Sequence, residues 1–166
     1  MKKLCCIMGV ILLMMSVFAG CTPEEEKVYD EAFLNDFKKG LMARWDQASD
    51  DNSADRSTFE ALINLELDRL NEYSDKKFED TQLQQDAITY INLLKKQKEA
   101  LTYYSGDITK YTELWDEAYS ARAQLITQII DKYELKFPDK YNETIEGFMS
   151  TAKVAHEKAE MDKKIE

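Results

Sequence analysis

Residues 108–129 read ITKYTELWDEAYSARAQLITQI, and the spacing of their apolar side chains decides the fold. These side chains recur at three-, four- and seven-residue steps, which places them on one face of a helix. They are Ile108, Tyr111, Trp115, Ala118, Leu125 and Ile129. The pattern stops at Phe137-Pro138, because the residue before a proline disfavours helical backbone angles. The segment therefore predicts a long amphipathic helix between Ile108 and Pro138.

Four more segments carry apolar stripes with helical spacing. We expect the first helix from about 23 to 48 and the last from about 139 to 159, with two helices between 57 and 105. The four stripes, in chain order, are Phe33, Leu34, Phe37, Leu41 and Trp45; Phe59, Leu62, Ile63, Leu67, Leu70 and Tyr73; Leu83, Ala87, Tyr90, Ile91, Leu94 and Leu101; and Tyr141, Ile145, Phe148, Met149 and Ala152. Each stripe predicts one face that is buried against a neighbouring helix.

Capping signals suggest where the two middle helices begin. Ser57-x-x-Glu60 and Thr81-x-x-Gln84 have the spacing of a capping box, in which side chains at both positions satisfy free backbone N–H groups. The turn-forming residues 105–107, Ser-Gly-Asp, predict the end of the third helix.

The composition agrees with a helical protein. The chain has 166 residues with only 5 Gly and 2 Pro, which are few turn-formers for a protein built of many strands. Several amphipathic helices with short connections pack most simply as an antiparallel bundle. We therefore predict an all-α fold, an antiparallel bundle of four to five helices behind an N-terminal signal peptide.

The first 20 residues have the layout of a secretory signal. Lys2 and Lys3 give a basic start, an apolar run extends from Leu4 to Phe18, and small residues follow. The apolar run is shorter than the ~20 residues that a membrane-spanning helix needs. An uncleaved N-terminal anchor, or a plain signal with an incidental cysteine, is the alternative interpretation.

The end of this segment, Phe18-Ala19-Gly20-Cys21, resembles the lipobox of bacterial lipoprotein precursors. Phe18 stands where that family usually has leucine, and the other three positions fit. The resemblance covers residues 1–21 only. It implies that the Cys21 thiol receives a diacylglyceryl group, that cleavage makes Cys21 the first mature residue, and that its amino group is acylated. It also implies attachment to the extracytoplasmic face of a cell membrane.

These observations divide the chain into four parts. Residues 1–20 form the removed signal, 21–26 a short lipidated tether, 27–160 the helical bundle, and 161–166 a frayed tail. The other two cysteines lie inside the signal, so the mature domain has no internal disulfide.

The charge of the chain limits its partners. The formal net charge is −10, and the signal takes two lysines with it. An acidic domain is repelled by nucleic-acid phosphates. We therefore expect no nucleic acid as partner. The expected partners are the membrane, through the lipid, and a protein or a component of the cell envelope.

Four polar residues lie on or beside the apolar stripes: Arg44, Glu66, Gln97 and Arg122. A charge removed from water needs a partner, so we predict that Arg122 and Glu66 are partly buried and near each other, or paired elsewhere in the bundle. One hypothesis is a polar network that sets the register of the helices. Another is a ligand pocket in which Arg122 binds an anionic group. The walls of that pocket would be Trp115, Tyr111 and Tyr119. A third is that the periodicity misleads and these residues are exposed.

A second candidate surface is aromatic. Tyr103 and Tyr104 lie beside a turn, and with Tyr111 and Tyr119 they could form an exposed surface for a glycan or a protein. The alternative is that these tyrosines are edges of the core with hydrated hydroxyl groups.

No motif supports catalysis or a metal centre. His156 is the one histidine, and with Glu160 it supplies at most two ligands without the His-Glu-x-x-His pattern. We expect no catalytic residue, no metal and no cofactor apart from the covalent lipid. The first hypothesis is thus a non-enzymatic binding module. The second is a small-ligand carrier with a pocket around Arg122, Glu66 and Trp115, and an enzyme is the third.

Overall fold

The computed structural model describes residues 28–50 and 55–162, and within these residues all regular secondary structure is helical. The predicted all-α fold is confirmed, because five α-helices pack against each other and no strand is present in these two segments. The α-helices are α2 (Asp30–Asp50), α3 (Arg56–Leu70), α4 (Thr81–Ala100), α5 (Ile108–Lys132) and α6 (Asn142–Asp162). Short 3₁₀ turns η1 (Asn71–Asp75), η2 (Leu101–Tyr103) and η3 (Asp139–Tyr141) lie between them.

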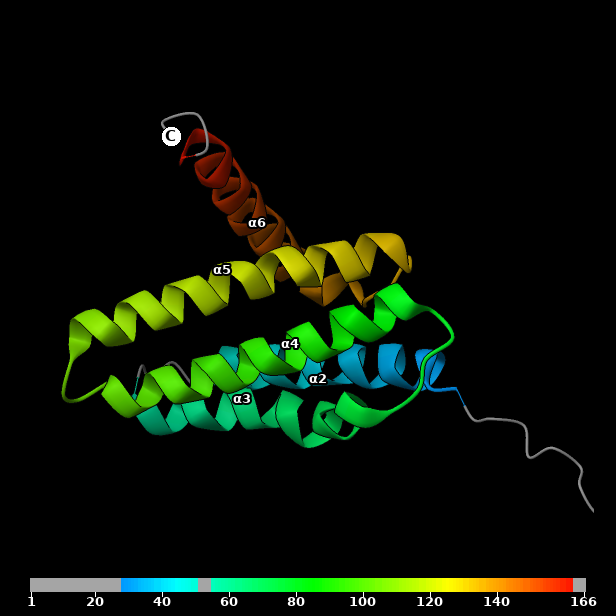
Figure 1. The fold of residues 1–166 in the computed structure, drawn as a ribbon, viewed down its shortest axis with the longest axis horizontal. Coiled ribbons are helices and arrows are strands. Elements are labelled where there is room, and N and C mark those ends of the chain that lie inside the picture. Colours follow the sequence, from blue (N-terminus) through cyan, green and yellow to red (C-terminus); the bar gives the residue numbers. More distant parts are fainter. Residues whose placement is uncertain (1–27, 51–54, 163–166) are drawn as a thin grey trace, which may run out of the picture.

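Helices adjacent in the chain lie side by side in space. Each of α3, α4, α5 and α6 packs against the helix before it (Figure 1). The start of α2, the connection from α3 to α4 and the end of α5 gather at one end of the bundle. The turn between α4 and α5 lies at the opposite end, and the later part of α6 projects away from the other helices.

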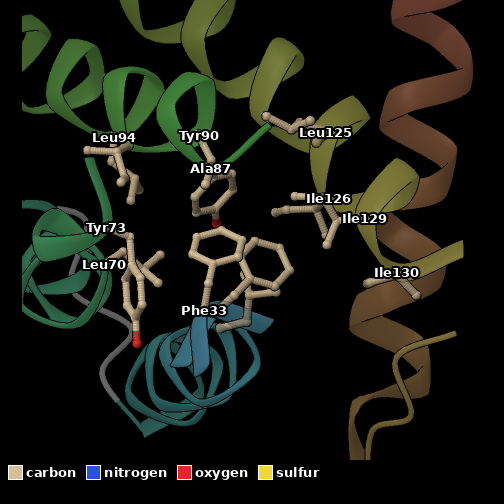
Figure 2. Close-up of a cluster of buried hydrophobic side chains, with 14 of the residues drawn as sticks. Phe33, Leu70, Tyr73, Ala87, Tyr90, Leu94, Leu125, Ile126, Ile129 and Ile130 are labelled. Atoms are coloured by element: carbon tan, nitrogen blue, oxygen red, sulfur yellow. The ribbon is translucent and has the colours of Figure 1, made fainter. Parts of the chain in front are cut away.

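The core is built from the predicted stripes of four helices. Figure 2 shows side chains from α2, α3, α4 and α5 that converge on one centre. Phe33 and Phe37 of α2 are fully buried, and the Phe37 ring lies 4.9 Å from the ring of Tyr90 in an edge-to-face arrangement. Aromatic pairs with this geometry add about 0.5–1.5 kcal/mol beyond the area that they bury.

Two residues of the predicted stripes are exposed to solvent. Ile108 is 63% exposed because it is the first residue of α5, at the end of the bundle. Met149 is 37% exposed because α6 packs chiefly against one helix, so its buried face is narrow. The predicted burial of these two side chains is therefore wrong.

The first helix begins later than predicted. Val28 and Tyr29 are not helical, and the Tyr29 N–H donates to the Lys77 carbonyl (3.2 Å). The Asp30 carboxylate then accepts from the backbone N–H groups of Glu79 and Asp80, both at 2.8 Å. These contacts hold the start of α2 at Asp30, whereas the sequence predicted a start near residue 23.

The two predicted capping boxes are also wrong in position. Asp55 caps α3, and its carboxylate accepts from the Thr58 N–H at 2.8 Å. Ser57 donates to this carboxylate instead of capping the helix. Asp80 caps α4, and accepts from the N–H groups of Gln82 and Leu83. In both helices a nearby aspartate, which is one of the preferred N-cap residues, takes the place of the predicted hydroxyl residue.

The fourth predicted helix, α5, ends at Lys132 and does not reach Pro138. Glu134 has a left-handed backbone (φ 50), and the Leu135 N–H donates to the Ile130 carbonyl at 3.0 Å. This is the geometry of a helix end with a left-handed residue, a position usually taken by glycine. A glutamate is uncommon at such a position, so this helix end could not be predicted from the residue types.

Asp80 should make stability depend on pH. Besides capping α4, its carboxylate accepts from the Tyr133 hydroxyl at 2.8 Å and from Lys132 Nζ at 3.2 Å. The backbone N–H of Leu83 and the Tyr133 hydroxyl lower the pKa of Asp80 from 3.8 to about 2. A depressed carboxyl pKa stabilises the fold above the unfolded pKa, and this contribution is lost as pH falls toward the folded value.

We therefore expect Asp80→Asn, which keeps a capping side chain, to lower Tm above pH 4 and to have a vanishing effect near pH 2. Thermal unfolding followed by circular dichroism from pH 2 to pH 7 measures this difference. Wild-type and variant Tm curves that stay parallel over this range would contradict the assignment.

Candidate functional site

A buried polar network joins four helices at the centre of the bundle. Glu66 of α3 is fully buried, and its carboxylate accepts from Arg44 Nη1 of α2 at 2.8 Å and from Arg122 Nη2 of α5 at 2.5 Å. The Tyr90 hydroxyl of α4 donates to the other oxygen of Glu66. The prediction that Arg122 and Glu66 lie near each other is confirmed by this ion pair.

The Arg122 side chain is enclosed by rings as well as by hydrogen bonds. Its Nε donates to the Tyr90 hydroxyl at 3.0 Å. Its guanidinium carbon lies 5.4 Å from the Tyr90 ring centroid and 5.8 Å from that of Phe148 on α6. Burial alone would lower the pKa of Arg122, but the Glu66 carboxylate and the Tyr90 oxygen raise it overall. The guanidinium is thus held in its charged form.

Gly40 allows α2 to approach α3 at the level of Glu66. A Cβ atom on Gly40 would lie 3.4 Å from Glu66 Cγ and 3.5 Å from Glu66 Cα. Neither Gly40 nor the hydrogen bonds of Tyr90 in the network were predicted from the sequence. Gly40 lies inside the predicted first helix, and a glycine at such a position often marks close packing of the backbone.

Gln97 is buried but does not join this network. It lies two turns beyond Tyr90 on α4 and has no solvent exposure. Its two amide atoms have no hydrogen-bond partner among the described residues. Of the four predicted polar residues, the structure therefore brings together Arg44, Glu66 and Arg122, and leaves Gln97 apart.

Four rings form a continuous surface cluster, here called the aromatic face. It consists of Phe59 on α3, Tyr104 after η2, and Tyr111 and Trp115 on α5, all half-buried. Neighbouring ring centroids lie 6.3 Å (Phe59–Tyr104), 5.0 Å (Tyr104–Tyr111), 5.6 Å (Tyr111–Trp115) and 5.1 Å (Trp115–Phe59) apart. The exposed Ile108 lies one turn before Tyr111 on the same helix.

Two of the predicted surface tyrosines are not part of this cluster. Tyr119 lies further along α5, where its ring packs 6.1 Å from that of Phe148. The Tyr103 ring lies 4.1 Å from Lys110 Nζ. Phe59 was not predicted as part of this surface, because it is on another helix and only the tertiary arrangement brings its ring to that of Trp115.

A polar depression borders the aromatic face. It has a volume of about 520 Å³, is open to solvent, and shares Tyr104 with the aromatic face. The residues around it are Asp55, Arg56, Ser57, Glu60, Tyr104 and Ser105. A rim of charged and hydroxyl groups beside exposed rings can contact both polar and apolar parts of a partner.

The aromatic face lies at the end of the bundle opposite to the start of α2. Figure 1 shows the turn between α4 and α5 at one end and the start of α2 at the other. A 20-residue helix such as α4 is about 30 Å long, so the two ends are separated by roughly that distance. The start of α2 therefore lies about one bundle length from the aromatic face.

Several predictions fall wholly or partly outside the described residues. These are the signal at 1–20, Cys21, the tether at 21–26, and the tail beyond Asp162, although α6 includes the first two residues of that predicted tail. In the described segments no helix is long and apolar enough to cross a membrane. Among the same residues, no group of three or more His, Cys, Asp or Glu side chains could hold a metal ion.

The network and the aromatic face differ in what they can do chemically. In the network, side chains from three helices donate hydrogen bonds to the Glu66 carboxylate and so connect these helices to α3. The aromatic face instead presents rings to solvent. Comparison with known proteins adds no relative: no family model, no curated protein and no solved structure matches this chain.

Proposed function

We propose that this chain is a lipid-anchored, extracytoplasmic binding protein without enzymatic activity. In this proposal a lipid on Cys21 attaches it to the membrane. The helical bundle is a rigid support, and the aromatic face binds a protein or another component of the cell envelope. The observation that carries the proposal is the aromatic face itself, four contacting rings left half-buried at one end of an otherwise packed bundle.

The residue types of the aromatic face support binding. Tyrosine and tryptophan are enriched at interfaces, where they combine a large apolar area with a polar group and lose little conformational freedom. Tyr111 and Trp115 are held by contacts with Tyr104 and Phe59. Because these rings are already ordered, little conformational entropy is lost when a partner covers them.

The position of the aromatic face supports the same function. If Cys21 carries the lipid, the short segment before Val28 keeps the start of α2 near the membrane. In this proposal the axis of the bundle points away from the membrane, which places the aromatic face, at the other end of the bundle, about 30 Å further out. A partner outside the membrane can reach it there without meeting the lipid surface.

The alternative function, a small-ligand carrier with a pocket around Arg122, Glu66 and Trp115, has less support. Trp115 belongs to the aromatic face and lies two helical turns from Arg122. Both oxygens of Glu66 are engaged by Arg44, Arg122 and Tyr90. The three residues named for the pocket therefore do not form one unoccupied polar surface.

The anchoring part is tested by Cys21→Ala. We expect complete loss of labelling by a radioactive fatty acid and release of the protein from the membrane fraction, because two acyl chains are needed for stable attachment. Metabolic labelling followed by immunoprecipitation measures both. Label that persists in the variant would contradict the lipid assignment but leave the aromatic face untouched.

The binding part is tested by photo-crosslinking in cells. We expect a photoreactive phenylalanine analogue at Tyr111 to give one discrete adduct, which weakens when Trp115 is changed to alanine. The matched control places the same analogue at Lys39, an exposed residue on α2. Truncation of a central aromatic contact costs about 2 kcal/mol in many interfaces, which corresponds to roughly a 30-fold loss of affinity. Equal adducts at both positions, or none at Tyr111, would count against this surface.

A further inference from the structure

The interior of the bundle holds one more positive than negative charge. Within the described residues, salt bridges join the guanidinium groups of Arg44 and Arg122 to Glu66 alone. Tyr90 adds no negative charge at neutral pH, because burial raises the pKa of its hydroxyl well above the usual value of 10.0. Two cations and one carboxylate leave a charge of +1 in a region removed from water, and an uncompensated buried charge is unfavourable.

Two N–H donors in this region have no hydrogen-bond partner among the described residues. They are Nη1 of Arg122 and Nε1 of Trp45. Arg122 is fully buried, and Trp45 is 7% exposed. Both side chains contact the same ring. The Phe148 centroid lies 5.8 Å from the Trp45 ring centroid and 5.8 Å from the Arg122 guanidinium carbon. The two residues with unpaired donors therefore both contact Phe148, and one of them, Arg122, belongs to the network with the excess positive charge.

We propose that a small monovalent anion of the size of chloride binds beside Phe148, where Trp45 of α2 and Arg122 of α5 meet α6. The anion would accept from Nη1 of Arg122 and from Nε1 of Trp45, and it would balance the excess charge of the network. A water molecule could satisfy one or both donors but would leave the charge uncompensated. The ion is a structural component of the bundle and acts independently of any partner at the aromatic face.

The surroundings of Phe148 favour a small ion over a large one. The rings of Trp45 and Tyr119 lie close to the Phe148 ring, at centroid distances of 5.8 and 6.1 Å, and such close ring contacts disfavour a phosphate or a larger carboxylate. Phe148 is 9% exposed, and α6 packs chiefly against α5.

The first test compares chloride with gluconate, a large organic anion, at constant ionic strength. The protein is purified in a non-ionic detergent and unfolded by heat. We expect Tm to rise with chloride concentration and to reach a plateau, because a ligand that binds only the folded state stabilises it. Trp45→Phe keeps a ring but removes the donor, and this variant should lose the chloride dependence. Identical Tm values in chloride and gluconate for the wild type would overturn the proposal.

The second test uses bromide, a heavy anion that quenches tryptophan fluorescence. The chain has two tryptophans, so Trp115→Phe leaves Trp45 as the sole emitter. We expect saturable quenching by bromide in this background. Adding Arg122→Met, which leaves Glu66 paired with Arg44, should weaken bromide affinity about tenfold or more. Quenching that stays linear in bromide concentration would overturn the proposal. If the Arg122 variant does not fold, the Trp45→Phe comparison decides.

Discussion

Glu66→Ala is expected to destabilise the bundle by about 3–5 kcal/mol, because it leaves buried charges without their partner. The carboxylate is the point at which α2, α4 and α5 meet α3 through Arg44, Tyr90 and Arg122. Its removal leaves two guanidinium groups close together in the interior. The pKa of Arg44 is already lowered by burial and then by the charge of Arg122, so Arg44 is the less favourable of the two cations.

Urea unfolding at pH 7 measures the loss. Glu117→Ala is the matched control, because Glu117 also forms a salt bridge, with Lys96, but its side chain is 65% exposed. A surface ion pair of this kind contributes less than about 1 kcal/mol. A Glu66 variant that loses no more than the Glu117 variant would show that the network does not hold the helices together.

Gly40→Leu is expected to cost about 3 kcal/mol, the upper part of the usual range for overpacking a core. Even the first side-chain carbon at this position would lie 3.4 Å from Glu66 Cγ, so the rest of a leucine would displace Glu66 or separate α2 from α3. Either change would also weaken the ion pairs with Arg44 and Arg122.

The chain provides a control for helix propensity. Gly147 lies inside α6, and a Cβ atom there would meet nothing within 4 Å. Gly147→Leu should therefore be neutral or stabilising by up to about 1 kcal/mol, since leucine favours helix over glycine. Urea unfolding of both variants separates the two effects. A similar change in stability at the two glycines would argue against close packing at Gly40.

A buried group whose hydrogen-bond partners come from several helices tolerates few substitutions, because each change disturbs more than one contact. The network occupies the same layer as Phe37, whose ring packs on Tyr90, so polar and apolar contacts there depend on one another. Substitutions at Glu66 and Gly40 should accordingly be non-additive, because the two residues touch.

Much of the fold could be predicted from the sequence because helical periodicity is local. The stripe from Tyr111 to Ile129 requires only contacts between residues three, four or seven apart, and α5 is present where that stripe predicted it. The same logic found Arg122 and Glu66, since a charge on an apolar stripe must be compensated when the stripe is buried. The ends of the helices could not be predicted in the same way. Asp55, Asp80 and Glu134 set them through individual hydrogen bonds or backbone angles that periodicity does not encode.

By itself, the sequence determined that the chain is helical, which faces are apolar, and which charges would need partners in the interior. The tertiary structure decided that Tyr90 and Gly40 complete the surroundings of Glu66. It also decided that Phe59 joins the aromatic face, that Gln97 lies outside the polar network, and that Tyr119 lies outside the aromatic face. The physical reason is that a stripe is a property of one helix. A contact between helices depends on their relative rotation and register, and these are set only when all the faces of the bundle are packed together.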